Sequence, residues 1–146
     1  ILKSMLSVGH RIPKKNILIS SGPTRSKVEL LNSTRMLIEK GYNIYSTAGT
    51  AKFFKENGID TQILYWPDED KEPNIMEYLH DRRIDLVINI PKNHTKRELD
   101  NGYKIRRAAV DYNIPLITNA RLASAFIYAI CKVDPSEIAI KSWDEY

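Results

Sequence analysis

Two threonines and a glycine separate an apolar segment from an amphipathic one, in the sequence STAGT at residues 46–50. The apolar pattern before them is typical of a strand, and the pattern after them is typical of a helix. A strand-to-helix turn presents backbone N–H groups, hydroxyls and the positive end of a helix dipole to one point. The turn therefore predicts a site for an anion, a phosphate or a carboxylate, held by Thr47, Gly49 and Thr50. Simple capping of the helix by a threonine is the alternative.

A second hydroxyl-rich turn, at residues 20–27, follows the first apolar segment and ends with two cations, Arg25 and Lys27. It could hold phosphate through Lys27, or it could be an ordinary strand-to-helix turn with Ser26 as the N-cap. It is not a Walker A loop, because the Gly-Lys-Ser/Thr ending is absent. Two such turns on neighbouring strands strengthen the prediction of one shared anion site.

An aromatic residue and an acidic cluster follow the third apolar segment of the chain. Trp66 could pack in the core or on the surface, or it could stack on a ligand ring. Asp68, Glu69 and Asp70 could be catalytic carboxylates, although acidic loop residues are usually only solvated. These residues are therefore weaker candidates than the two turns.

Asn89 ends a strongly apolar segment, where a buried amide needs hydrogen-bond partners, and it is a candidate ligand contact. Lys92, Asn93 and Thr95 extend the polar reach of the loop that follows. The three histidines are scattered without metal-ligand spacing, and no Ser-His-Asp or Cys-His set is visible. The sequence therefore predicts no metal site.

The composition fits one soluble domain of 146 residues, of which 42% are hydrophobic and 27% charged. The formal net charge of +4 suits an anionic ligand, but no long basic run with interleaved aromatic residues predicts nucleic-acid binding. No apolar run approaches the roughly 20 residues that span a bilayer, so no membrane partner is expected. Cys131 is the single cysteine, which excludes an internal disulfide and favours a buried thiol and a cytoplasmic setting.

Short apolar segments alternate with longer amphipathic ones along the chain. Strands are predicted at residues 16–20, 42–46, 60–64, 84–89 and 114–118. Helices are predicted at residues 26–40, 50–56, 75–80, 103–112 and 120–132, with a long polar loop at 91–100. This order predicts an α/β doubly wound fold, a five-stranded mainly parallel sheet with helices on both faces. In such folds ligands bind beyond the carboxyl ends of the strands, where both turns lie.

The order of these segments resembles a known family. It is carried by YSTAGTA at 45–51, WP at 66–67, DLVINIPKN at 85–93, IRRAAVD at 105–111 and IPLITN at 114–119. The chain resembles the methylglyoxal-synthase-like domain, most closely the version at the C-terminus of the carbamoyl phosphate synthetase large chain. The resemblance implies a linker and short helix from a preceding synthetase domain at 1–15, the domain itself at 16–133, and a tail at 134–146.

The resemblance implies regulation rather than catalysis. This domain binds an allosteric effector in the synthetases, UMP or IMP in bacterial enzymes and N-acetylglutamate in the urea-cycle enzyme. Effector contacts carry over to Thr47, Thr50 and Asn89, and phosphate contacts to Ser21 and Lys27.

The remaining family positions leave the effector open. Trp66 stands where some bacterial members have lysine, and the loop at 89–93, with Lys92 and Asn93, is nearer the N-acetylglutamate type. The resemblance implies no cofactor in this domain. It implies ATP, Mg²⁺ and K⁺ in the rest of a glutamine-hydrolysing ligase of pyrimidine and arginine synthesis, with the rest of the large chain and a glutaminase small chain as partners.

The main alternative is a methylglyoxal synthase, which needs a carboxylate base beside a phosphate pocket to act on dihydroxyacetone phosphate. Family synthases have His-Asp after the first strand, where this chain has Ser21 and Gly22. Their Gly-Gly-Asp loop after the third strand is replaced by residues 66–70. The phosphate cradle persists without the acid–base set, so no catalytic residue is expected. The cyclohydrolase domain of purine biosynthesis shares the threonine turn but fits the later segments less well.

Overall fold

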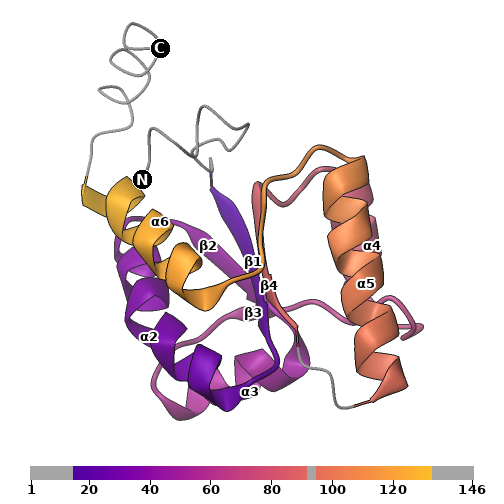
Figure 1. Ribbon diagram of the computed structural model, residues 1–146, viewed down its shortest axis with the longest axis horizontal. Helices are drawn as coiled ribbons and strands as arrows, with labels where there is room; N and C mark the ends of the chain where they lie inside the picture. The colour runs from indigo at the N-terminus through magenta and orange to yellow at the C-terminus, as the bar shows by residue number, and fades with distance from the viewer. Residues whose placement is uncertain (1–14, 92–94, 133–146) are drawn as a thin grey trace, which may run out of the picture.

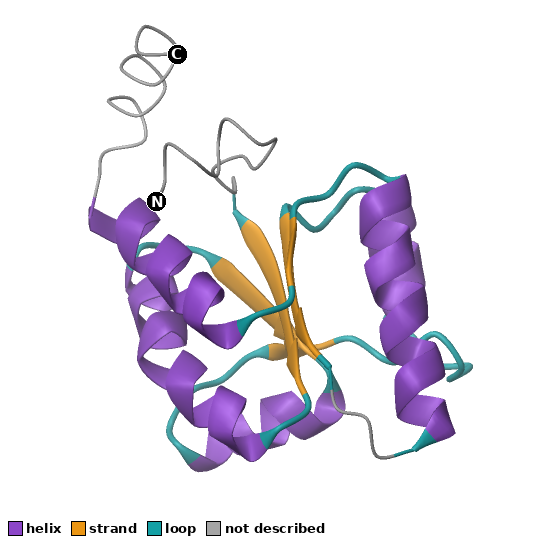
Figure 2. Cartoon of the chain, in the orientation of Figure 1, coloured by secondary structure: helices purple, strands orange, loops and turns teal. Residues whose placement is uncertain are grey.

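The computed structural model describes residues 15–91 and 95–132. Most of the linker expected at 1–15, all of the tail expected at 134–146, and both Lys92 and Asn93 lie outside the described residues. The rest of the chain folds into one layered α/β unit with a sheet between two sets of helices (Figures 1 and 2).

The sheet has five strands in the order β3-β2-β1-β4-β5, and all four neighbouring pairs are parallel. The strands are β1 (Asn16–Ser21), β2 (Asn43–Ser46), β3 (Gln62–Ile63), β4 (Leu86–Ile90) and β5 (Leu116–Ile117). From β1 in the middle of the sheet, the chain moves outward to β3 and then crosses back to β4. The strand order therefore reverses beside β1, and in open α/β sheets this is the point where ligands bind.

Within residues 15–91 and 95–132, five helices cover both faces of the sheet, which confirms the predicted doubly wound fold. They are α2 (Thr24–Glu39), α3 (Ala48–Glu56), α4 (Ile75–His80), α5 (Lys96–Asp111) and α6 (Ala120–Lys132). Figure 1 shows α2, α3 and α6 on one side of the sheet, and α4 and α5 on the other.

The two central strands are buried on both faces, which explains why they are continuous apolar runs rather than alternating ones. Ile17 and Ile19 of β1 pack in the layer of α2, α3 and α6, whereas Leu18 packs in the layer of α4 and α5. In β4, Ile88 and Val87 divide between the same two layers. All five side chains have no exposed surface, so β1 and β4 form a rigid platform for the residues that follow them.

The predicted loop at 91–100 is wrong in its second half, because α5 begins at Lys96. The cause is the N-cap residue Thr95, in the Thr-x-x-Glu sequence typical of a capping box. The hydroxyl of Thr95 accepts a hydrogen bond from the Glu98 N–H (3.1 Å) and donates to the Glu98 carboxylate (3.2 Å). Ser26 is not the N-cap of α2, because Pro23 holds that position and Ser26 lies in the first turn. The edge strands β3 and β5 are also shorter than predicted, at two residues each.

Candidate anion-binding site

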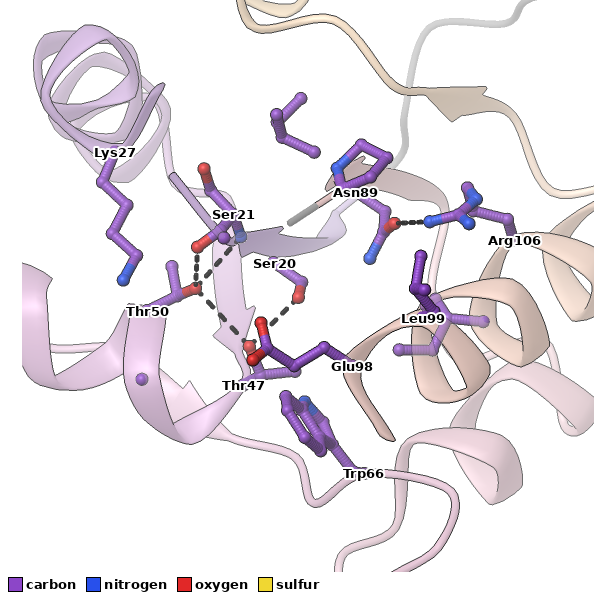
Figure 3. Close-up of a pocket in the computed structure, with 16 residues that line it drawn as sticks. Ser20, Ser21, Lys27, Thr47, Thr50, Trp66, Asn89, Glu98, Leu99 and Arg106 are labelled. Atoms are coloured by element: carbon purple, nitrogen blue, oxygen red, sulfur yellow. Dashed lines mark hydrogen bonds between the residues drawn. The ribbon is translucent and has the colours of Figure 1, made fainter. Parts of the chain in front are cut away.

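A cavity of about 240 Å³ opens at the carboxyl edge of the sheet, where β1, β2 and β4 end. Its lining includes seven of the nine residues predicted as site residues, namely Ser21, Lys27, Thr47, Gly49, Thr50, Trp66 and Asn89. Figure 3 shows most of their side chains around one space, although they come from five separate segments of the chain. The other two predicted residues, Lys92 and Asn93, lie outside the described part of the chain.

Two helices begin at this cavity. Pro23 and Thr47 are the N-cap residues of α2 and α3, and neither accepts a side-chain capping hydrogen bond among the described residues. The first N–H groups of a helix have no acceptor inside the helix, and they carry the positive end of its dipole. Lys27 adds a cation from the first turn of α2 and lines the same cavity. This side of the cavity is therefore suited to a negatively charged group.

The hydroxyl of Thr50 connects α3 to the end of β1. It accepts a hydrogen bond from the Ser21 N–H (3.0 Å) and lies 3.2 Å from the Ser21 carbonyl oxygen, to which it donates. Thr47 lies beside it, with its hydroxyl 3.1 Å from that of Ser20. Thr50 is only 2% exposed, so the main role of its hydroxyl is to hold α3 against the end of β1. The threonines of this turn thus make no side-chain cap of α3 among the described residues, and Thr50 instead fixes the neighbouring strand.

Ser21 is different from the two threonines. Its side chain is 3% exposed and lines the cavity, yet its Oγ atom has no hydrogen-bond partner within the described part of the chain. A buried hydroxyl without a partner costs free energy, so native structures seldom leave one without a reason. An acceptor on a ligand in the cavity would satisfy it.

The opposite side of the cavity is formed by β4 and α5. Arg106 donates a hydrogen bond to the Asn89 side-chain oxygen (2.7 Å), and Asn89 is 4% exposed. Gly102, one turn before Arg106, leaves room for it, because a Cβ atom there would lie 2.9 Å from the Arg106 Nη1 atom. The amide of Asn89 thus orients a guanidinium at the cavity wall (Figure 3).

The sequence analysis does not predict Arg106 as a site residue, because the only local signal there is the short basic pair Arg106-Arg107. The capping box at Thr95 and Glu98 was the signal that could have found it. Starting the helix at Lys96 places Glu98, Gly102 and Arg106 on neighbouring positions of one helix face. All three line the cavity.

None of the three acidic residues of the loop after β3, at 68–70, lines the cavity. Asp68 pairs with Arg97, and this hydrogen-bonded guanidinium lowers the pKa of the Asp68 carboxyl to about 2. Glu69 accepts a hydrogen bond from the Trp66 N–H (3.2 Å). Among the described residues, Glu98 is the carboxylate that lines the cavity, and it accepts a hydrogen bond from the Thr95 hydroxyl.

Other kinds of site receive no support from residues 15–91 and 95–132. No group of three metal-ligating side chains occurs there, and none of the helices is long and apolar enough to cross a membrane. Cys131 is 6% exposed, and burial raises the pKa of its thiol, as expected for a buried cysteine rather than a nucleophile.

Comparison with known proteins identifies the family. Residues 29–118 match the family model described as the MGS-like domain. This chain belongs to the MGS-like domain family. The expected resemblance to the methylglyoxal-synthase-like domain is thereby confirmed.

The relatives of this domain are much longer proteins. Multifunctional protein ura1 of Schizosaccharomyces pombe is 44% identical over 138 residues, which cover 90% of this chain and 6% of the relative. The C-terminal section of the carbamoyl phosphate synthase large chain of Aquifex aeolicus is 38% identical over 128 residues, covering 88% of this chain and 23% of the relative. This domain therefore corresponds to a small part of each relative.

A solved structure supports the fold. Methylglyoxal synthase from Elizabethkingia anophelis matches with a TM-score of 0.56 over 80% of this chain and 79% of that chain. The sequence identity is 16%, so the match concerns the fold and not the chemistry.

The connection between Thr50 and Ser21 can be tested by stability measurements. Replacing Thr50 with Val should lower the free energy of unfolding by about 1–3 kcal/mol, because the buried Ser21 N–H and carbonyl lose a partner. Ser46→Ala is the matched control, since Ser46 is fully buried and its Oγ has no partner among the described residues. Urea denaturation should show little or no loss for the control. Equal losses in both variants would mean that the Thr50 bridge contributes nothing specific.

Proposed function

We propose that this domain is the effector-binding regulatory domain of a carbamoyl phosphate synthetase large chain or of the equivalent region of a multifunctional protein. One observation carries the proposal: Ser21, whose buried hydroxyl has no partner among the described residues, lines a cavity at which two helices begin. The family membership and the relatives support the same assignment. The negative group of the effector binds beside Ser21, Lys27 and the N–H groups near Gly49.

The second side of the cavity limits the effector to a small molecule with polar groups at both ends. Asn89 and Arg106 bind the end of the effector that is farther from Lys27. Trp66 forms the cavity wall between Lys27 and these two residues. A nucleotide monophosphate such as UMP or IMP meets this requirement, and so does N-acetylglutamate. Lys92 and Asn93 remain proposed contacts of the same ligand.

Regulation requires that the effector bind two states of the parent enzyme with different affinity. The parent that we propose is an ATP-dependent, glutamine-hydrolysing ligase of the cytoplasm that serves pyrimidine or arginine synthesis. It uses Mg²⁺ and K⁺ in its synthetase domains and a glutaminase small chain or domain as its partner. This domain itself binds no nucleic acid, membrane, metal or cofactor in the proposal, and its role is to tune the ligase.

Methylglyoxal synthesis is the alternative, because the fold is shared with that enzyme. The reaction needs a general base close to the substrate, with a pKa suited to proton transfer near neutral pH. The low pKa of Asp68 makes it a poor base, and Arg97 already occupies its carboxylate. Glu98 is the remaining candidate among the described residues that line the cavity, and its carboxylate accepts a hydrogen bond from the hydroxyl of Thr95, the N-cap of α5. These contacts favour binding over catalysis.

The Ser21 hydroxyl provides the sharpest test of the binding site. Calorimetric titration of the wild-type domain with UMP, IMP, UTP and N-acetylglutamate should show binding of at least one of them. Ser21→Ala should weaken that binding roughly 3- to 10-fold, the usual effect of one lost hydrogen bond. Ser46→Ala removes a buried hydroxyl that does not line the cavity, so it should leave the affinity unchanged. Absence of binding by all four compounds would argue against the regulatory role.

Incubation with dihydroxyacetone phosphate separates the two functions. We expect no methylglyoxal from the pure domain, because Glu98, the one carboxylate among the described residues that line the cavity, is already hydrogen-bonded to the Thr95 hydroxyl. The reaction can be followed by colorimetric detection of methylglyoxal, with a Glu98→Gln variant as the reference. Formation of methylglyoxal by the wild type above the level of that variant would establish an enzyme and refute the regulatory assignment.

A further inference from the structure

The loop between β3 and α4 holds Trp66 by its backbone. The Trp66 carbonyl accepts hydrogen bonds from the Glu69 N–H (3.0 Å) and from the side-chain amide of Asn74 (3.0 Å). The Trp66 N–H donates to the Glu69 carboxylate (3.2 Å), and the Asn74 amide also donates to the Glu69 carbonyl (2.9 Å). These hydrogen bonds hold the loop together internally. The position of Trp66 therefore depends on the position of the whole loop.

Asp68 joins this unit to α5. Its N–H donates to the side-chain oxygen of Asn101 (3.2 Å), and its carboxylate accepts two hydrogen bonds from Arg97, at 2.6 Å from Nε and 3.1 Å from Nη2. Asn101 is 2% exposed, and its amide nitrogen donates to the Arg97 carbonyl (2.9 Å). Asp68, Arg97 and Asn101 thus form one connected set of contacts between loop and helix.

Arg97 also contacts the indole. Its guanidinium carbon lies 5.0 Å from the centroid of the Trp66 ring, within the range of a cation–π interaction. Trp66 lines the cavity, whereas Arg97 and Asp68 are not among its lining residues. One cation therefore bridges the carboxylate that fixes the loop and the ring that forms the cavity wall.

We propose that Arg97 and Asp68 are positioning residues. They hold the indole of Trp66 against the cavity and at a fixed distance from Arg106 on the opposite wall. Both α5 residues, Arg97 and Arg106, belong to one rigid helix, so the contact to Asp68 sets the distance between the two walls. The consequence for ligands rests on the proposed function. Effectors long enough to reach Trp66 depend on Arg97, whereas a small anion at the α2 and α3 N-termini does not.

The position of the indole can be tested without any ligand. The chain has two tryptophans, so a Trp143→Phe background makes Trp66 the single tryptophan, whose emission is followed with excitation that avoids the tyrosines. In that background Arg97→Ala should shift the Trp66 emission to longer wavelength and increase its quenching by acrylamide, because the guanidinium no longer covers the ring. Arg97→Lys, which keeps a cation but not the two-atom contact, should fall between wild type and Arg97→Ala.

Arg107→Ala is the matched control, because Arg107 lies on the same helix and forms a similar exposed ion pair, 3.2 Å from Asp111. It should leave the emission of Trp66 unchanged. Thermal unfolding should give similar midpoints for Arg97→Ala and Arg107→Ala, since both remove one exposed ion pair. Unchanged emission and quenching in Arg97→Ala would overturn the proposal, whatever the ligand results.

Binding measurements test the consequence for ligands. They use inorganic phosphate as the small anion, and UMP and N-acetylglutamate as the longer probes. Arg97→Ala should weaken binding of a longer probe roughly fivefold, the scale of one lost exposed ion pair, and leave phosphate binding unchanged. The Asp68→Ala/Arg97→Ala double variant should bind a longer probe no more weakly than the weaker-binding single variant, because both residues act through one contact.

Equal loss of affinity for phosphate and the longer probes, or no loss for either, would contradict the proposal. If the wild type binds none of the three, the proposed function fails, and the emission of Trp66 still decides the positioning role.

Discussion

The hydrogen bonds of the Thr50 hydroxyl to the N–H and carbonyl of Ser21 determine how the cavity is built. Ser21 is the last residue of β1 and pairs with Ile90 of β4, while the next N–H, that of Gly22, donates to the Ile90 carbonyl (3.0 Å). A single buried hydroxyl from α3 thereby fixes the point where the central strands end. Because α2 and α3 both start there, the same contact brings two positive helix ends to one place.

The cavity that results has a cationic group on each side and one carboxylate among its described lining residues. Lys27 and Ser21 lie on one side, and Arg106, oriented by Asn89, lies on the other. Such an arrangement suits the binding of an anion with two polar ends better than it suits proton transfer. The acidic residue nearest in sequence to Trp66, Asp68, serves as an anchor for α5 instead of as a base. These contacts are the physical basis for assigning recognition rather than turnover.

Local patterns predicted the parts of the molecule that depend on local sequence. The apolar runs predicted β1 and β4 because both strands are buried on two faces, and the threonine turn predicted the start of α3 within two residues. The Arg106 contact to Asn89 joins positions 17 residues apart and depends on the phase of α5, which the overlooked capping box sets. The Arg97 contact to Asp68 spans 29 residues and follows from the packing of α5 on the loop, which no local pattern encodes.

The central claim is that an anion binds at the N-termini of α2 and α3 and is released without chemical change. Amide NMR spectra of the domain, recorded during titration with UMP or N-acetylglutamate, test it directly, with the ligand signals followed in the same samples. The account predicts saturable shifts of the amides of Ala48, Gly49 and Ser21, together with ligand signals that stay constant over hours. Shifts confined to residues away from the cavity, or conversion of the ligand to a product, would contradict it.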